Sequence, residues 1–234
     1  MSEQRPTLHI LDGGFRPRPE QIEAYYKRHE EFLPLAMSQP GFCETYGGPI
    51  LGSPWWFFAA KFDTLENMER WQLNRAHTDV QDQARKVWWT GYYLRKGRLL
   101  GVAENAEGRI LCETFILRDS PLSTSEQHWT DGILTQVSEF PLVPYETVIG
   151  ERILTPYLFG GPVGIAPQHA PVQYVLLTYW SSTTDCSHWQ ESDNYRRISE
   201  LGAIQSSRFV IIPERQSRMG LASNRLQREW LLKE

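Results

Sequence analysis

The sequence has no long apolar run and no block of basic residues. No apolar stretch reaches the roughly 20 residues that a membrane-spanning helix needs. The first ten residues are polar and lack the apolar core of a signal peptide, so we expect a cytoplasmic protein that does not contact a membrane. Because the net charge is −4 and no basic patch is present, we do not expect nucleic acid as a partner.

Patterns that bind metals or phosphate are also missing. The three cysteines, Cys43, Cys112 and Cys186, are widely spaced and form no CxxC pair, so we interpret them as reduced thiols. The sequence contains no HxxxH motif and no carboxylate-rich cluster of the kind that holds a metal ion. Its Gly-Gly-Pro tracts lack the strand and helix that flank a phosphate-binding loop. We therefore expect no bound metal ion.

Aromatic residues, by contrast, are abundant, and their pattern occurs twice. The chain of 234 residues contains nine Trp, ten Tyr and ten Phe, which suits either a large core or a pocket for a flat ligand. Trp71 corresponds to Trp189 and Phe62 corresponds to Trp180, and both pairs are 118 positions apart. A shared offset over a strand and the helix that follows it predicts an internal repeat.

Each half of the chain has the order strand, helix, strand, strand, helix, strand. In the first half, hydrophobic periodicity predicts strands at 7–11, 42–46, 55–62 and 91–95, with helices from 20 to about 34 and from 64 to about 87. In the second half it predicts strands at 109–117, 146–148, 173–180 and 208–212, with helices at 121–137, 184–201 and 220–234. A Gly- and Pro-rich insertion at 155–171 is typical of a long loop. The predicted repeats are 1–104 and 109–234.

Two βαββαβ halves predict an α+β protein built from two tandem ferredoxin-like repeats. Each four-stranded sheet would carry helices on one face and leave the other face bare and apolar. Because a bare apolar face must be buried, we expect the two sheets to pack face to face as an α/β barrel with the helices outside. The space between the sheets is then the expected pocket.

The run from Trp71 through His77 and Arg85 to Trp88 and Tyr92 resembles the second half of antibiotic biosynthesis monooxygenase domains. The second repeat, around 179–195, is similar to the related heme-degrading monooxygenases, and the run 15–29 is similar to EthD domains. All three families belong to the dimeric α/β-barrel superfamily. Its members are usually single domains that dimerise, whereas a tandem chain would form the barrel internally. Further association into a homodimer stays open.

The resemblance implies a cofactor-independent monooxygenase that oxidises a small aromatic or polyketide-like substrate with dioxygen. Such an enzyme needs a base, a dry aromatic pocket and groups that hold the substrate anion. The candidate catalytic residues are His77, which would act as the base because a neutral histidine titrates near working pH, Trp71 and His9. The candidate substrate-binding residues are Trp55, Trp56, Trp88, Tyr92, Trp189 and Arg85.

Each of these residues also has a structural interpretation, and two other functions stay open. His77 also fits a histidine on a helix surface, and Trp71 and Trp189 also fit core positions. The same fold would serve a dehydratase, cyclase or isomerase of a polyketide-like compound, or a non-catalytic protein that binds heme or an aromatic ligand. In the heme-degrading family that the second repeat resembles, the histidine that ligates the iron follows the helix tryptophan by about three turns. Ten residues after Trp71 and Trp189 this chain has Gln81 and Ser199, which ligate iron poorly, so heme is disfavoured. Only the first repeat has the histidine, so we expect one active pocket.

Overall fold

The computed structural model describes residues 8–49, 56–118, 120, 123–126, 148–154 and 172–212. Its antiparallel strands and packed helices confirm the predicted α+β class. The chain divides into two compact units. Among the described residues, the first unit contains 8–45, 56–98 and 212, and the second contains 46–49 and the rest of 99–211. The repeat boundaries and the packing of the two sheets as one barrel stay predictions.

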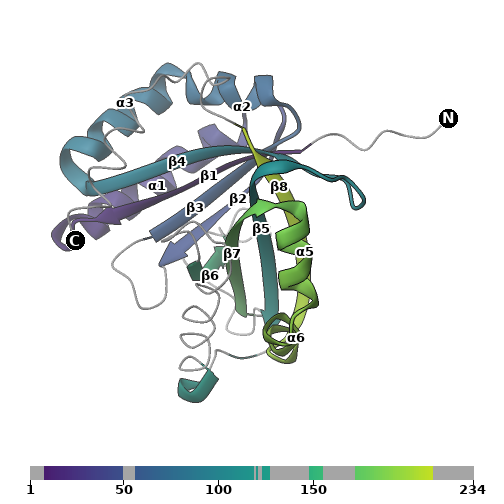
Figure 1. The fold of residues 1–234 in the computed structure, drawn as a ribbon. Coiled ribbons are helices and arrows are strands. Elements are labelled where there is room, and N and C mark those ends of the chain that lie inside the picture. The colour runs from purple at the N-terminus through teal and green to yellow at the C-terminus, as the bar shows by residue number, and fades with distance from the viewer. Residues whose placement is uncertain are drawn as a thin grey trace. The chain divides into compact units, whose positions relative to one another are not determined.

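The first unit is a four-stranded antiparallel sheet with the strand order β4–β1–β3–β2 (Figure 1). Its strands are β1 (His9–Pro17), β2 (Phe42–Pro49, which ends in the second unit), β3 (Trp56–Phe62) and β4 (Trp89–Leu99). Its helices are α1 (Ile22–Met37), α2 (Leu65–Gln72) and α3 (Arg75–Gln83), with the short turns η1 (Pro19–Gln21) and η2 (Ala84–Trp88). Side chains of α1 and α2 pack on one face of the sheet, where Leu11, Phe62, Met68 and Trp71 form a buried core.

The second unit has the equivalent strand order, β8–β5–β7–β6. Its strands are β5 (Glu107–Arg118), β6 (Val148–Leu154), β7 (Val172–Ser182) and β8 (Ala203–Ile211), and its helices are α5 (Thr183–Glu191) and α6 (Asp193–Glu200). The offset of 118 places Leu65, where α2 begins, at Thr183, where α5 begins. The same offset places the first residue of α3 at the first residue of α6.

Matching polar side chains cap the helices of both units. Thr64 accepts a hydrogen bond from the Asn67 amide at 3.1 Å, and Ser182 accepts one from the Asp185 amide, also at 3.1 Å. The cap at Thr64 confirms the sequence prediction for the start of that helix. The predicted long helices over 64–87 and 184–201 are each two helices, because Asn74 and Ser192 accept backbone hydrogen bonds and start a second helix. Both new caps are again 118 positions apart.

The first strand is longer than its predicted range of 7–11. Asp12-Gly13-Gly14 is a turn signal in the sequence, but β1 continues through it to Pro17. The reason is pairing on both sides, since Gly13 lies opposite Phe58 of β3 and Leu94 of β4. Backbone hydrogen bonds to two neighbours outweigh a local turn preference. This extension brings Phe15 and Arg16 into the sheet, and both matter for the site.

Other sequence predictions fall on parts of the chain for which no structure is described. These are most of the helix at 121–137, the insertion at 155–171, the helix at 220–234 and Trp55. The longest described helix, α1, has 16 residues. No helix in the described ranges is long and apolar enough to cross a membrane.

The three free cysteines differ in exposure, and this difference makes a simple prediction. Cys43 is exposed, whereas Cys112 and Cys186 are both 0% exposed in the core of the second unit. Because reaction needs an accessible thiolate, a disulfide reagent such as DTNB should modify one thiol of the native protein, and the other two only after unfolding. The native Cys43→Ser variant should show no rapid phase. Rapid modification of two or three thiols in the native chain would contradict this burial.

Candidate functional site

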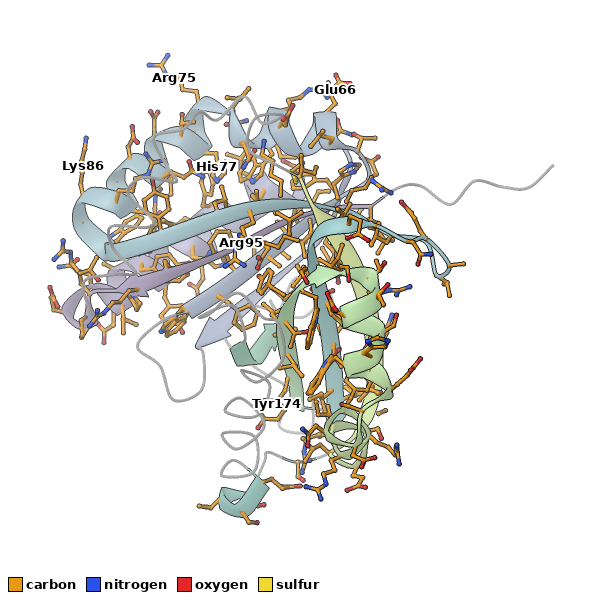
Figure 2. All side chains as sticks on the ribbon, viewed as in Figure 1. Glu66, Arg75, His77, Lys86, Arg95 and Tyr174 are labelled. Atoms are coloured by element: carbon orange, nitrogen blue, oxygen red, sulfur yellow. The ribbon has the colours of Figure 1, made fainter. Side chains whose placement is uncertain are left out.

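His77 lies between the first sheet and helix α3, on the helix-covered side of β4 (Figure 2). Its ring stacks on that of Trp71, with centroids 4.1 Å apart and planes 8° apart. Its Nδ1 lies 3.0 Å from the Trp71 carbonyl oxygen, and its Nε2 lies 3.1 Å from Nε2 of Gln81. A neutral ring that donates from Nδ1 to the carbonyl and accepts at Nε2 from the amide satisfies both contacts.

The environment of His77 also favours the neutral ring. Burial lowers the pKa of His77 to about 4, the Trp71 carbonyl opposes this shift, and Arg85 adds to it. Both ring nitrogens are thus engaged at pH 7: Nδ1 joins α3 to the Trp71 carbonyl of α2, and Nε2 contacts Gln81 within α3. A role as proton acceptor would require one of these contacts to break, and the catalytic role of His77 stays a prediction.

The lowered pKa of His77 predicts that acid destabilises the first unit. His77 titrates near 6.5 in the unfolded chain and near 4 in the folded one, so the unfolded state takes up the proton first. Stability is therefore full above pH 6.5 and falls as the pH drops toward 4, by at most about 3 kcal/mol. Urea unfolding of the wild type and of His77→Gln at pH 7 and pH 4.5 measures this. The variant should lose less stability between the two pH values, and equal losses would contradict the assignment.

The other predicted catalytic residues, Trp71 and His9, also lie on the side of the first sheet that the helices cover. Trp71 is 5% exposed and packs against Phe32, with ring centroids 5.4 Å apart. His9 lies opposite Phe62 in the sheet, and because paired residues share a face, it lies on the helix-covered side as well. Their catalytic roles stay predictions, and what the structure gives for Trp71 is a core position.

In the second unit, Trp189 occupies the place of Trp71. It is 0% exposed, with ring centroids 5.7 Å from Trp180 and 5.8 Å from Tyr195. Tyr195 stands where His77 stands in the first unit, and its hydroxyl contacts Thr114 at 3.4 Å. The second unit therefore has a hydroxyl in place of the imidazole. The ring of Trp189 is enclosed by the core of the second unit. Its substrate-binding role stays a prediction.

One cluster of aromatic contacts in the first unit contains four of the predicted substrate-binding residues, which are Trp56, Arg85, Trp88 and Tyr92. The centre of this cluster is Phe15, which stacks on Trp89 with centroids 4.9 Å apart and touches Tyr25 at 5.0 Å. The Tyr25 ring meets Trp88 edge-on at 6.1 Å. Sequence patterns did not single out Phe15, because the predicted strand ended before it.

The same cluster extends in two directions. Trp56 lies 6.1 Å from Phe15 and 5.5 Å from Tyr26 between ring centroids. On the other side, Tyr92 lies 6.1 Å from Trp89, and the Arg85 guanidinium lies 5.3 Å from the Tyr92 ring centre. Strands β1, β3 and β4, helix α1 and the turn η2 thus bring Trp56 into one cluster with Arg85, Trp88 and Tyr92, which come later in the sequence and are close to one another.

Three titratable side chains of helix α1, Tyr25 and Tyr26 of the cluster and His29 beside Tyr25, are uncharged near pH 7. Burial raises the pKa of Tyr25 well above its usual range, and neighbouring Tyr26 adds to the shift. Burial likewise raises the pKa of Tyr26. Burial lowers the pKa of His29, which is partly opposed by Glu30. These three groups therefore add no charge to the aromatic cluster.

A pocket opens beside the cluster where β1 ends. Its volume is about 580 Å³, which lies in the usual range for small-molecule sites. The lining residues come from β1, the turn after it, α1, β3 and β4, and they are Arg16, Pro17, Pro19, Ile22, Trp56 and Thr90. Trp56 is the predicted substrate-binding residue among them, and Arg16 is their one charged residue. The pocket can hold a flat apolar body with one polar or anionic group.

The prolines explain why the chain forms a hollow here. The pairing of β1 with β4 shifts register between Arg16 and Pro17, and the strand ends. The amide of Arg18 then donates to the Trp88 carbonyl at 2.7 Å, and Pro19 starts η1. Proline fixes its own φ and lacks an amide hydrogen, so this segment leaves the sheet without becoming a strand or a regular helix.

Two buried carboxylates went unrecognised in the sequence patterns. Asp12 lies opposite Ala59 and Glu113 lies opposite Leu177, and 59 and 177 are again 118 apart. Both carboxylates are 0% exposed, and each has an interaction partner. Asp12 is also opposite Arg95, which Figure 2 shows on the other side of β4 from His77. Asp12 was missed because Asp12-Gly13-Gly14 looks like a turn.

The expected absence of a cofactor stays a prediction. Within the described ranges, no group of three or more His, Cys, Asp or Glu side chains is placed to hold a metal ion. Gln81, at one of the positions considered for heme, bonds to His77. Heme binding and the absence of cofactors stay predictions.

Comparison with known proteins supports the fold. No family model matches the sequence, and no curated protein sequence matches it. Among solved structures, an aldoxime dehydratase is 10% identical with a TM-score of 0.51, over 92% of this chain and 84% of that chain. An anthrone oxidase-like protein is 10% identical with a TM-score of 0.37, over 91% and 94%. A monooxygenase-like protein from Listeria innocua is 11% identical with a TM-score of 0.30, over 89% and 95%.

The likeness to the aldoxime dehydratase, with its TM-score of 0.51, supports the predicted α+β fold of an antiparallel sheet with packed helices. At such low identity the likeness is one of fold. Membership of the antibiotic biosynthesis monooxygenase family therefore stays a hypothesis.

Proposed function

We propose that this chain is an enzyme of the antibiotic biosynthesis monooxygenase type that oxidises a small aromatic or polyketide-like molecule with dioxygen, without metal or flavin. The observation that carries this proposal is the pocket of about 580 Å³, which has Trp56 in its wall and adjoins the aromatic cluster around Phe15. An aromatic side chain in the wall can hold a planar substrate by stacking.

The proposed reaction needs no external reductant. Loss of a proton makes the aromatic substrate electron-rich enough to pass electrons to dioxygen. At an activated methylene, one oxygen atom replaces the two hydrogens to give a carbonyl, and the other oxygen atom leaves with those hydrogens as water. The carbon supplies all four electrons that dioxygen takes up. The protein then has to orient the substrate, stabilise its anion and exclude bulk water.

Oxygen uptake with an anthrone-type substrate tests the proposal. We expect the protein to accelerate uptake above the uncatalysed autoxidation, with one dioxygen consumed for each ketone formed. A product that gains no oxygen and also forms without air would instead identify a dehydratase, cyclase or isomerase. Binding without conversion across a panel of hydroxylated polycyclic substrates would indicate a non-catalytic ligand-binding protein.

A further inference from the structure

Two of the three cysteines lie together in the core of the second unit, on the side of the sheet that α5 covers. Cys112 of β5 and Cys186 of α5 belong to one buried cluster, and both are 0% exposed. We infer that this pair is a site of reversible oxidation, at which hydrogen peroxide joins the two sulfurs in a disulfide that links β5 to α5. The inference is independent of the proposed oxygenase, because the pocket residues belong to the first unit.

Contacts on both sides of Cys186 place this part of α5 over Cys112. Gln190 lies one turn after Cys186 on the same face of α5, and its Nε2 contacts the Cys112 sulfur at 3.6 Å. Arg208, which is opposite Cys112 in the sheet, donates from its guanidinium to the Ser187 hydroxyl at 3.3 Å. The Cys186 thiol also hydrogen-bonds to Cys112 directly. The two sulfurs are therefore neighbours, as disulfide formation requires.

The surroundings of the two sulfurs give them different roles. The hydrogen bond from the Cys186 thiol lowers the pKa of Cys112. Burial opposes this shift, whereas Thr114, Thr178 and Arg208 add to it. The same hydrogen bond and burial raise the pKa of Cys186. Cys112 is thus the sulfur that loses its proton first, and the thiolate is the form that attacks an oxidant.

The oxidation proceeds in two steps. The Cys112 thiolate attacks one oxygen atom of hydrogen peroxide, the O–O bond breaks, and a sulfenic acid and hydroxide form. Cys186 then attacks the sulfenic sulfur, the S–S bond forms as the S–O bond breaks, and the departing hydroxide leaves as water with the Cys186 proton. The first hydroxide takes up the proton lost from Cys112. Two thiols and one peroxide thus give one disulfide and two waters, and the two electrons lost by the sulfurs are gained by the peroxide oxygens.

Burial selects the oxidant and does not prevent the reaction. Hydrogen peroxide is close to water in size, and brief local opening of the structure admits it. Disulfide formation adds no atom to the core, because the chain only loses two hydrogens. A bulky reagent such as DTNB would have to place an aromatic thiolate against the sulfur, and the packed core excludes it. A sulfenic acid at Cys112 also meets the neighbouring thiol before a second peroxide can oxidise it further.

The positions of the cysteines in the sequence provide an internal control. Cys112 is 69 positions from Cys43 and 74 positions from Cys186, so loop closure in an unfolded chain favours neither partner. The wild-type protein is treated with hydrogen peroxide at low protein concentration, once in the native state and once in concentrated urea. Remaining thiols are then blocked with iodoacetamide after unfolding, and peptide mapping by mass spectrometry without reduction identifies each disulfide.

In the native protein, the Cys112–Cys186 disulfide should exceed the Cys43–Cys112 disulfide by about tenfold or more, because only the first pair is held in contact. In urea the two disulfides should differ by less than about twofold. Dithiothreitol should restore both core thiols. The Cys43→Ser variant, which lacks the exposed thiol, should form the Cys112–Cys186 disulfide as the wild type does.

Three outcomes would overturn the inference. The first is a native protein in which both core thiols still react with iodoacetamide on unfolding after peroxide has fully oxidised Cys43. The second is the same mixture of disulfides in the native protein as in urea, since the native contact would then have no part in the pairing. The third is oxidation of Cys112 to a sulfinic acid that dithiothreitol does not reverse.

Discussion

Replacing Trp189 with alanine should destabilise the second unit by about 3–5 kcal/mol. The side chain is 0% exposed, and its ring is flanked by Trp180 and Tyr195. Truncation would leave a large cavity between α5 and the sheet, and a packed core closes such a cavity only in part. Urea unfolding monitored by far-ultraviolet circular dichroism measures the change.

Trp56→Ala is the matched control for that experiment. Trp56 is partly exposed at the pocket, so its loss removes less buried surface and should cost less than half as much stability. A Trp189→Ala variant that lost less than about 1 kcal/mol would show that the second core is not packed as described.

The second large effect should appear in activity. Trp56→Ala should lower kcat/KM for an aromatic substrate by about 30- to 100-fold, since aromatic anchors in pockets commonly contribute 2 kcal/mol or more to binding. Trp56→Phe keeps an aromatic wall and should retain activity within about threefold. Steady-state rates for the three proteins on one substrate measure this. Equal activity of the alanine and phenylalanine variants would show that the reaction does not take place in this pocket.

Much of the fold could be predicted because both halves of the sequence carry the same signals. Trp71 and Trp189 mark the same core position after equivalent strands, and Thr64 and Ser182 cap the helices that carry these two tryptophans. Such signals are local, and local patterns determine strand and helix positions. The end of β1 could not be predicted, because pairing of Gly13 with two distant strands overrides a local turn preference.

The site could be predicted only in part. The sequence indicated Trp56, which lines the pocket, and Trp88, Tyr92 and Arg85, which join the cluster beside it. Arg16 entered the sequence analysis only as part of the run 15–29, which is similar to EthD domains. Its place in the pocket depends on three strands meeting, and periodicity within one segment carries no information about that.

The position of His77 shows the same limit. His77 follows Trp71 by six positions, a spacing that does not make neighbours within one helix, and the contacts of its ring nitrogens depend on the break between α2 and α3 at Asn74. That break turns the His77 ring onto Trp71 and brings Nδ1 to the Trp71 carbonyl. Sequence alone could therefore offer His77 as a base, but could not foresee that both nitrogens have partners.

Isotope labelling tests the proposed oxygenase most directly. The protein is incubated with an activated aromatic methylene substrate under ¹⁸O₂, and the ketone product is analysed by mass spectrometry after correction for autoxidation. We predict one labelled oxygen atom in the enzyme-dependent product and a large loss of that product with Trp56→Ala. Enzyme-dependent product that carries no label, or that forms at the same rate without dioxygen, would contradict the proposal.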